Sequence, residues 1–124
     1  MEKETRNLLL ADLSGRVPYG VKIQVTIKDV VCQVDVYSVF NDGGVYVKDD
    51  NFIDSVDIAE VKPYLFPLSS MTEEEIKEYK HLVAFSGSSN GAANFTDWLN
   101  KNHFDYRGLI EKGLALDATN LNVY

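Results

Sequence analysis

The pentapeptide GSSNG, at residues 87–91, has the G-x-S-x-G spacing of the nucleophile turn in α/β hydrolases, with Ser89 as the nucleophile. His103 and Asp105 follow it, so the residue types of a Ser–His–Asp triad are present. That turn requires a strand ahead of the serine in a large parallel sheet, and 124 residues are too few to build one. We therefore interpret residues 86–94 as a flexible, polar surface loop, and a hydrolase using Ser89 ranks last among three hypotheses.

The residues that commonly bind metals form no recognisable pattern here. The chain has one cysteine, Cys32, and two histidines, His81 and His103, without an H-E-x-x-H motif, paired cysteines or an EF-hand loop. In the acidic segment DDNFIDSVD, Ile53 and Asp54 stand where a calcium loop needs an oxygen ligand and a glycine. Cys32 lies among valines, which is typical of a small core residue rather than a nucleophile. We predict no catalytic residue, no cofactor and no metal.

Six residues are predicted to contact a partner, because large aromatic side chains commonly serve in cores or at interfaces. They are Tyr64, Phe66, Trp98, His103, Tyr106 and Arg107. Such rings would also stack bases in a small β-barrel that binds single-stranded nucleic acid, but that barrel needs a basic groove. No basic groove is evident in the sequence. We therefore predict a protein partner, with single-stranded nucleic-acid binding as the alternative.

The negative charge is concentrated in one segment of the chain. The net charge is −7, and residues 49–78 hold nine acidic side chains against Lys62 and Lys77, whereas the charges elsewhere cancel. Phosphate backbones attract basic surfaces, so this balance argues against general nucleic-acid binding. An acidic stripe would suit a basic partner or imitate a nucleic acid. Its simplest interpretation is a solvated face that keeps the protein soluble.

The cysteine content and the N-terminus predict a cytoplasmic protein. A single cysteine excludes an intrachain disulfide, which fits a reducing compartment. The N-terminal residues MEKETRNLLLADLSG carry two early glutamates and too short an apolar run for a secretory signal. No stretch approaches the ~20 apolar residues of a membrane span, so we expect no membrane partner.

The first half of the chain is predicted to form a short helix and a β-meander, at residues 1–15 and 18–62. Thr5 is the expected helix cap and Gly15 the expected helix end. Alternation of apolar and polar residues predicts strands over 21–28 and 30–40. Their inward side chains are Val21, Ile23, Val25 and Ile27 in the first strand and Cys32, Val34, Val36 and Phe40 in the second.

Two turns are predicted to connect these strands. Lys28 and Asp29 make a tight connection, and NDGG at residues 41–44 supplies residues that tolerate the positive φ of hairpin turns. A third strand follows, with Val45 and Val47 inward. A weaker fourth strand is predicted near residues 56–61, where a helical turn is the alternative.

The second half begins with an extended connector over residues 63–71, since residues before proline are pushed toward extended geometry. Thr72 and Glu75 form a capping box, which predicts a helix from there to about residue 84. Asn94 is the expected cap of a second helix over residues 95–102.

A third helix is predicted to run from Asp105, at the N-cap position, to Gly113 just past its end. All three helices fall within residues 72–113. The tail, residues 114–124, is expected to add an edge strand or to be partly loose.

These elements predict an α+β fold in a single domain over residues 1–124. We expect a small twisted antiparallel sheet or partial barrel of three to five strands, followed by two or three packed C-terminal helices. A meander this short leaves an edge strand unpaired. Pairing of two copies along that edge would give a homodimer.

Three stretches resemble one family: RVPYGVK at residues 16–22, KPYLFPLSSMTEEE at 62–75 and HFDYRGLIEKGLAL at 103–116. This family is a group of small hypothetical proteins of gut anaerobic bacteria, their prophages and their phages, and the likeness extends over nearly the whole chain. It implies a phage or mobile-element origin and implies no activity. Similar sequences often carry Arg where this chain has Phe66, so a contact made by that Arg would be absent here. The leading hypothesis is a non-enzymatic accessory or interaction protein of a phage or mobile element.

Overall fold

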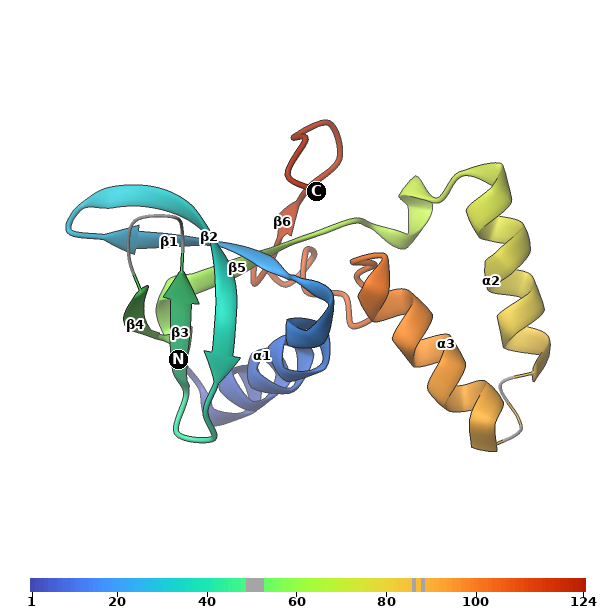
Figure 1. The fold of residues 1–124 in the computed structure, drawn as a ribbon, viewed down its shortest axis with the longest axis horizontal. Helices are drawn as coiled ribbons and strands as arrows, with labels where there is room; N and C mark the ends of the chain where they lie inside the picture. Colours follow the sequence, from blue (N-terminus) through green and yellow to red (C-terminus); the bar gives the residue numbers. More distant parts are fainter. Residues whose placement is uncertain (49–52, 86, 88) are drawn as a thin grey trace.

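The computed structural model describes residues 1–48, 53–85, 87 and 89–124, and it confirms the α+β fold. Its sheet has six strands in the order β4-β3-β2-β1-β5-β6. All neighbours pair antiparallel except β5 and β6, which are parallel. Figure 1 shows the sheet at one end of the molecule and two C-terminal helices at the other.

The N-terminal helix α1 (Lys3–Arg16) begins earlier and ends later than predicted. Glu2 occupies the N-cap position in place of Thr5, without a side-chain cap hydrogen bond. Gly15 lies inside the helix rather than at its end, and a Cβ placed there would come 3.2 Å from the side-chain nitrogen of Asn100. Glycine is used here for close packing. A short 3-10 turn, η1 (Val17–Tyr19), follows.

Strands β1 (Lys22–Ile27) and β2 (Val30–Val39) form the predicted hairpin. Lys28 and Asp29 connect them with φ values of 51° and 66°, and positive φ at both central residues is the mark of a type I′ turn. The predicted inward faces are confirmed for Val21, Ile23 and Val25, all of which are buried.

One prediction for β2 is wrong, because Phe40 does not share the inward face. The register between β2 and β3 (Gly44–Lys48) shifts between Val36 and Ser38, which marks a β-bulge. One extra residue reverses the side to which later side chains point. Phe40 is consequently 47% exposed and packs edge-on against Tyr46, with 5.0 Å between ring centroids.

The segment predicted as a weak fourth strand, residues 56–61, holds the end of one strand, a 3-10 turn and the first residue of the next strand, so the helical turn given as the alternative lies at its centre. β4 (Ile53–Asp57) is an edge strand, η2 (Ile58–Glu60) reverses the chain, and β5 (Val61–Leu65) pairs with β1. The predicted connector over residues 63–71 is therefore wrong in its first three residues. Proline has no N–H to donate to a neighbouring strand, so it fits a strand only where pairing ends. Pro63 is the last residue of β5 that pairs with β1, and pairing with β6 begins only at the next residue, Tyr64.

After the turn η3 (Leu68–Ser70), the predicted capping box is confirmed at the start of α2 (Glu73–Phe85). The Glu75 amide donates to the Thr72 hydroxyl at 3.2 Å, and the Thr72 amide donates to the Glu75 carboxylate at 2.9 Å.

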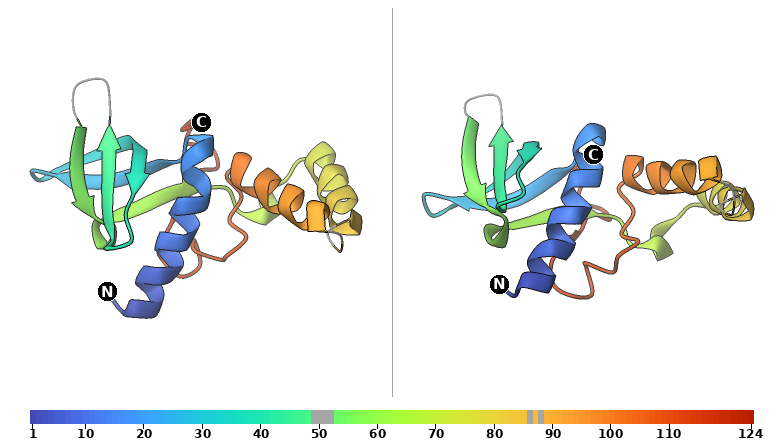
Figure 2. Two further views of the ribbon diagram at one scale, coloured as in Figure 1. Left: turned by 60° about the horizontal axis from the view of Figure 1, so that its bottom comes forward. Right: turned by 90° about the horizontal axis from the view of Figure 1, so that it is seen from below.

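Helix α3 (Ser89–Lys101) corrects two further predictions. Residues 89–94 are helical rather than a flexible loop, and Asn94 lies inside the helix instead of capping it. Residues 86 and 88 of the predicted loop lie outside the described residues. We refer to α2 and α3 together as the helical arm, and Figure 2 shows α1 between this arm and the sheet, with α2 farthest from the sheet.

The third predicted helix does not form. Residues 105–113 make successive turns, and Gly108 has a φ of 71° that no right-handed helix contains. Asp105 accepts the amides of Leu109 and Ile110 at 2.8 and 2.9 Å, so its carboxylate closes a turn instead of capping a helix. The tail does add an edge strand, β6 (Leu116–Asp117).

The predicted acidic stripe is not a single surface. Asp54, Asp57 and Glu60 lie on β4 and η2, whereas Glu73 to Glu75 and Glu78 lie on α2, at the opposite end of the molecule (Figure 1). Asp49 and Asp50 lie outside the described residues. Within the described part of the chain, no helix is both long and apolar enough to span a membrane.

Candidate functional site

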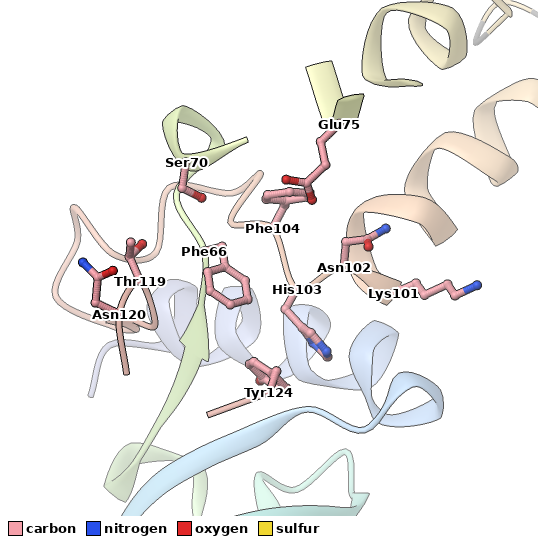
Figure 3. A pocket seen from close by; sticks show the side chains of 10 residues that line it. All are labelled: Phe66, Ser70, Glu75, Lys101, Asn102, His103, Phe104, Thr119, Asn120 and Tyr124. Atoms are coloured by element: carbon pink, nitrogen blue, oxygen red, sulfur yellow. The ribbon is translucent and has the colours of Figure 1, made fainter. Parts of the chain in front are cut away.

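The candidate site is a cavity of about 420 Å³ where the helical arm meets the sheet. It is lined by Phe66, Ser70, Glu75, Lys101, Asn102, His103, Phe104, Thr119, Asn120 and Tyr124. Figure 3 shows Phe66, His103 and Tyr124 close together, with Thr119 and Asn120 to one side and Asn102 and Lys101 to the other. The lining thus combines residues of the arm, of the end of β5 and of the C-terminal segment.

His103 has an unusual backbone and an unusual partner. Its φ is 61°, in the left-handed region that side chains other than glycine seldom adopt. Its ring stacks on Tyr124, with 3.6 Å between centroids and 10° between planes. Its Nδ1 atom is buried and has no hydrogen-bond partner among the described residues. Stacking and the backbone, rather than a hydrogen bond to Nδ1, therefore hold the ring in place.

The environment keeps both stacked rings uncharged at neutral pH. Burial, and then the positive charge of Arg16, lower the pKa of His103 to about 4. Burial is the main reason that the pKa of Tyr124 rises to about 12. The Tyr124 hydroxyl donates to the Tyr64 carbonyl at 2.8 Å and accepts the Lys22 amide at 2.9 Å, which ties this ring to the sheet.

The polar groups of the lining are chiefly amides and hydroxyls. Asn102 uses its amide nitrogen to donate to the Trp98 carbonyl at 2.9 Å, and the Ser70 hydroxyl donates to the Pro67 carbonyl at 2.6 Å. Lys101 and Glu75 supply one positive and one negative charge. In the part of the chain that is described, no group of three or more His, Cys, Asp or Glu side chains is placed to hold a metal ion. This arrangement is suited to recognition by stacking and hydrogen bonding.

Behind the cavity lies a buried polar network that the sequence did not reveal. Asp12 and Arg16, both completely buried on α1, form an ion pair at 2.9 Å. Arg107 donates to the same carboxylate at 2.9 Å and to the Tyr106 hydroxyl at 2.7 Å. That hydroxyl in turn donates to Asn100 of α3 at 2.9 Å.

This network fixes the segment that carries His103. Arg16 donates to the Phe104 carbonyl at 2.7 Å, one residue beyond His103. The guanidinium groups of Arg16 and Arg107 both lie over the Tyr106 ring, 5.2 and 4.6 Å from its centroid. One carboxylate, that of Asp12, thus serves two guanidinium groups that hold α1, α3 and the turn after α3 together.

The six predicted contact residues separate into four places. Phe66 and His103 line the cavity, with Phe66 tilted against Tyr124 at 5.9 Å. Trp98 lies inside the arm, between Tyr79 and Phe104. Tyr106 and Arg107 belong to the buried network, and Tyr64 is buried in the sheet.

Sequence reasoning missed Tyr124, Thr119 and Asn120 because the tail was treated as peripheral. It also missed Asp12 and Arg16. Their i, i+4 spacing on a helix was a usable signal, but the helix was predicted to end at Gly15, one residue too early.

The two residues singled out as nucleophiles lie away from this cavity. Ser89 begins α3, after α2 rather than after a strand, while His103 follows the other end of the same helix. Thirteen helical residues span roughly 20 Å, so these two residues do not meet. Cys32 is half-buried on β2 and lines a separate cavity of about 360 Å³ beside Ile27, Val30 and Ile53.

Comparisons with protein-family models, with curated proteins and with solved structures find no match for this chain.

Proposed function

We propose that this chain is a small non-enzymatic accessory protein of a phage or mobile element that acts in the cytoplasm by binding another protein through its helical arm. The mobile-element origin rests on the resemblance of residues 16–22, 62–75 and 103–116 to that family. The mode of action rests on one observation: none of the residues 73–85, all of them described, is buried.

A helix without a buried residue gains little from packing in the free protein. α2 contacts α3 through Tyr79, whose ring lies 5.4 Å from Phe95 and 6.4 Å from Trp98. As a whole, α2 lies at the far end of the molecule from the sheet (Figures 1 and 2). Isolated helices of this length are marginal in water, so a partner that covers α2 would account for its presence.

The two alternatives have less support. A nucleic-acid-binding barrel needs a closed or nearly closed sheet with a basic groove, whereas the described strands form an open order with β4 and β6 at its edges. A hydrolase using Ser89 needs a base within hydrogen-bonding reach, and His103 lies beyond the opposite end of α3.

The proposal is tested by exchanging two charges on α2. In the double variant Lys77→Glu with Glu78→Lys, composition and net charge are unchanged, and both side chains are exposed. The matched control exchanges Glu60 and Lys62, exposed residues near β4. Tagged proteins are recovered from host lysate with and without nuclease, and the captured proteins are identified by mass spectrometry.

We expect a specific protein that survives nuclease treatment, is lost from the arm variant and is retained by the control. Capture that is equal for both variants would contradict the role of the arm. Partners that disappear with nuclease would instead favour the nucleic-acid alternative.

A further inference from the structure

The cavity between arm and sheet has the size and walls of a small-molecule site. Its volume of about 420 Å³ falls within the range of roughly 300–1,000 Å³ that is usual for ligand pockets. Residues distant in sequence, from Phe66 to Tyr124, converge on it (Figure 3). It lies apart from the outer side of α2, so this inference does not depend on the proposed function.

The walls of the cavity favour a flat ring. Phe66, His103 and Tyr124 present aromatic surfaces, and the left-handed backbone of His103 fixes one of them in a stacked position. Arg16 holds the Phe104 carbonyl, so the turn that carries His103 is fixed before any ligand arrives. Preorganised aromatic faces bind planar groups by stacking, at little cost in conformational entropy.

The polar groups of the lining favour a ring with donors and acceptors on its edge. Asn102 commits its nitrogen to Trp98, which leaves its side-chain oxygen as an acceptor. Thr119 adds a hydroxyl group and Asn120 adds a second side-chain amide. The turn that carries them is closed by the backbone N–H of Thr119, which donates to the Asp117 carboxylate at 2.8 Å. Amides and hydroxyls both donate and accept, as do the edges of nucleobases.

The charges favour an uncharged ligand. Glu75 and Lys101 contribute one charge of each sign to the lining, and the whole chain carries a net charge of −7. A phosphate group would gain little from one lysine that is balanced by one glutamate, on a chain whose net charge is negative.

We propose that this cavity binds an uncharged, planar heteroaromatic compound of the nucleoside class, stacked against Phe66 and His103. The base could come from a free nucleoside or from a nucleotide or oligonucleotide, and the charges select the free nucleoside.

The chain provides a direct spectroscopic test. It contains only two histidines, His81 on the exposed side of α2 and His103 in the cavity, so their imidazole proton signals are resolved in a one-dimensional NMR spectrum. A His81→Asn variant assigns them. Adenosine, guanosine, cytidine and uridine are each titrated at neutral pH, and affinities are measured by calorimetry. The 5′-monophosphates and a short single-stranded oligonucleotide form the comparison arms.

At least one nucleoside is expected to shift the His103 signal and leave the His81 signal unchanged. Phe66→Leu should weaken that binding about tenfold, the usual scale of one lost stacking contact. Phe40→Leu, which removes an equivalent ring in the β2–β3 turn, should leave it unchanged. If Phe66→Leu fails to fold, the titration of the parent protein still tests the proposal, because the His103 signal reports binding at the cavity without any substitution.

The proposal is overturned if no nucleoside binds at millimolar concentration, or if binding leaves the His103 signal in place. Tighter binding of the monophosphates or of the oligonucleotide would also overturn it, because the ligand would then be recognised through its phosphates.

Discussion

Asp12 balances the guanidinium group of the buried Arg16 and that of the partly buried Arg107, and Arg16 holds the carbonyl next to His103. Asp12→Asn keeps the shape of the side chain but leaves Arg16 and Arg107 without a counter-charge. Breaking a buried ion pair from one side typically costs about 3–5 kcal/mol, so we expect a loss of that order in the free energy of unfolding.

Urea denaturation measures this loss, and Lys22–Asp35 provides the control. That ion pair has a similar distance, 3.0 Å, but lies at the surface, where such pairs contribute about 0–1 kcal/mol. Equal effects of Asp12→Asn and Asp35→Asn would show that the buried network adds little.

His103 should make stability depend on pH in acid. The pKa of its imidazole is about 4 in the folded protein and near 6.5 in the unfolded chain. Between these values the unfolded chain binds more protons, so the free energy of unfolding falls as pH decreases from about 6.5 to 4 and is constant with respect to this group above 6.5. The ring is partly exposed, so we expect a loss of roughly 1–2 kcal/mol after allowing for solvent screening.

The comparison of His103→Asn with the parent protein isolates this group, because asparagine tolerates a φ of 61° and does not titrate. The variant should lose part of the slope of stability against pH, whereas His81→Asn should retain all of it. Parallel curves for the parent and His103→Asn would contradict the half-buried, neutral state of His103.

At the residue scale, the sequence identified Phe66 and His103 as candidates but not their surroundings. Aromatic type alone pointed to these residues. Phe66 and His103 contact Tyr124 because His103 has a left-handed backbone and because the C-terminal segment returns to the end of β5. Both features depend on tertiary structure and cannot be predicted from residue type. Arg16 was not identified as a core residue because a buried arginine needs several partners. Asp12, four residues earlier on the same helix, is one that the sequence could have indicated, whereas the Phe104 carbonyl comes from a distant segment.

At the element scale, the β1–β2 turn offers a stabilising change. Asp29 adopts a φ of 66° without being glycine, and left-handed backbone costs non-glycine residues roughly 1–2 kcal/mol. In Asp29→Gly, glycine relieves this backbone strain, but its greater entropy in the unfolded chain offsets part of the gain. The free energy of unfolding should therefore rise by about 0.5–1 kcal/mol. Thermal unfolding checks this, with Asp29→Ala as a control that should be less stable than the parent.

The elements that the sequence predicted well are those with local causes. Alternation defined β1, a side-chain capping box defined the start of α2, and positive-φ residues defined the hairpin turns. The errors have non-local causes. Residues 89–94 look like a loop in the sequence but belong to α3, which packs on α2 through Phe95 and Tyr79. The proline-containing segment of β5 looks like a connector but forms a strand because it pairs with β1. Local propensity is a weak guide where tertiary contacts oppose it.

At the scale of the whole molecule, the charge pattern of the sequence does not survive folding. The acidic residues of 49–78 are divided between β4 with η2 and α2, at opposite ends of the molecule (Figure 1). Contiguity along the chain therefore predicted a surface that the fold does not build. The more informative feature is the unequal burial of the two ends. The main hydrophobic core lies between the sheet, α1 and the C-terminal segment, whereas α2 buries no residue.

That inequality makes hydrogen exchange the most direct test of the central claim, which is binding through the arm. In the free protein, amides of α2 should exchange faster than those of β1 and β2, because opening α2 exposes little apolar surface. On addition of the captured partner, we predict protection concentrated in peptides from residues 73–85. Protection confined to the sheet, with α2 exchanging as before, would contradict the account.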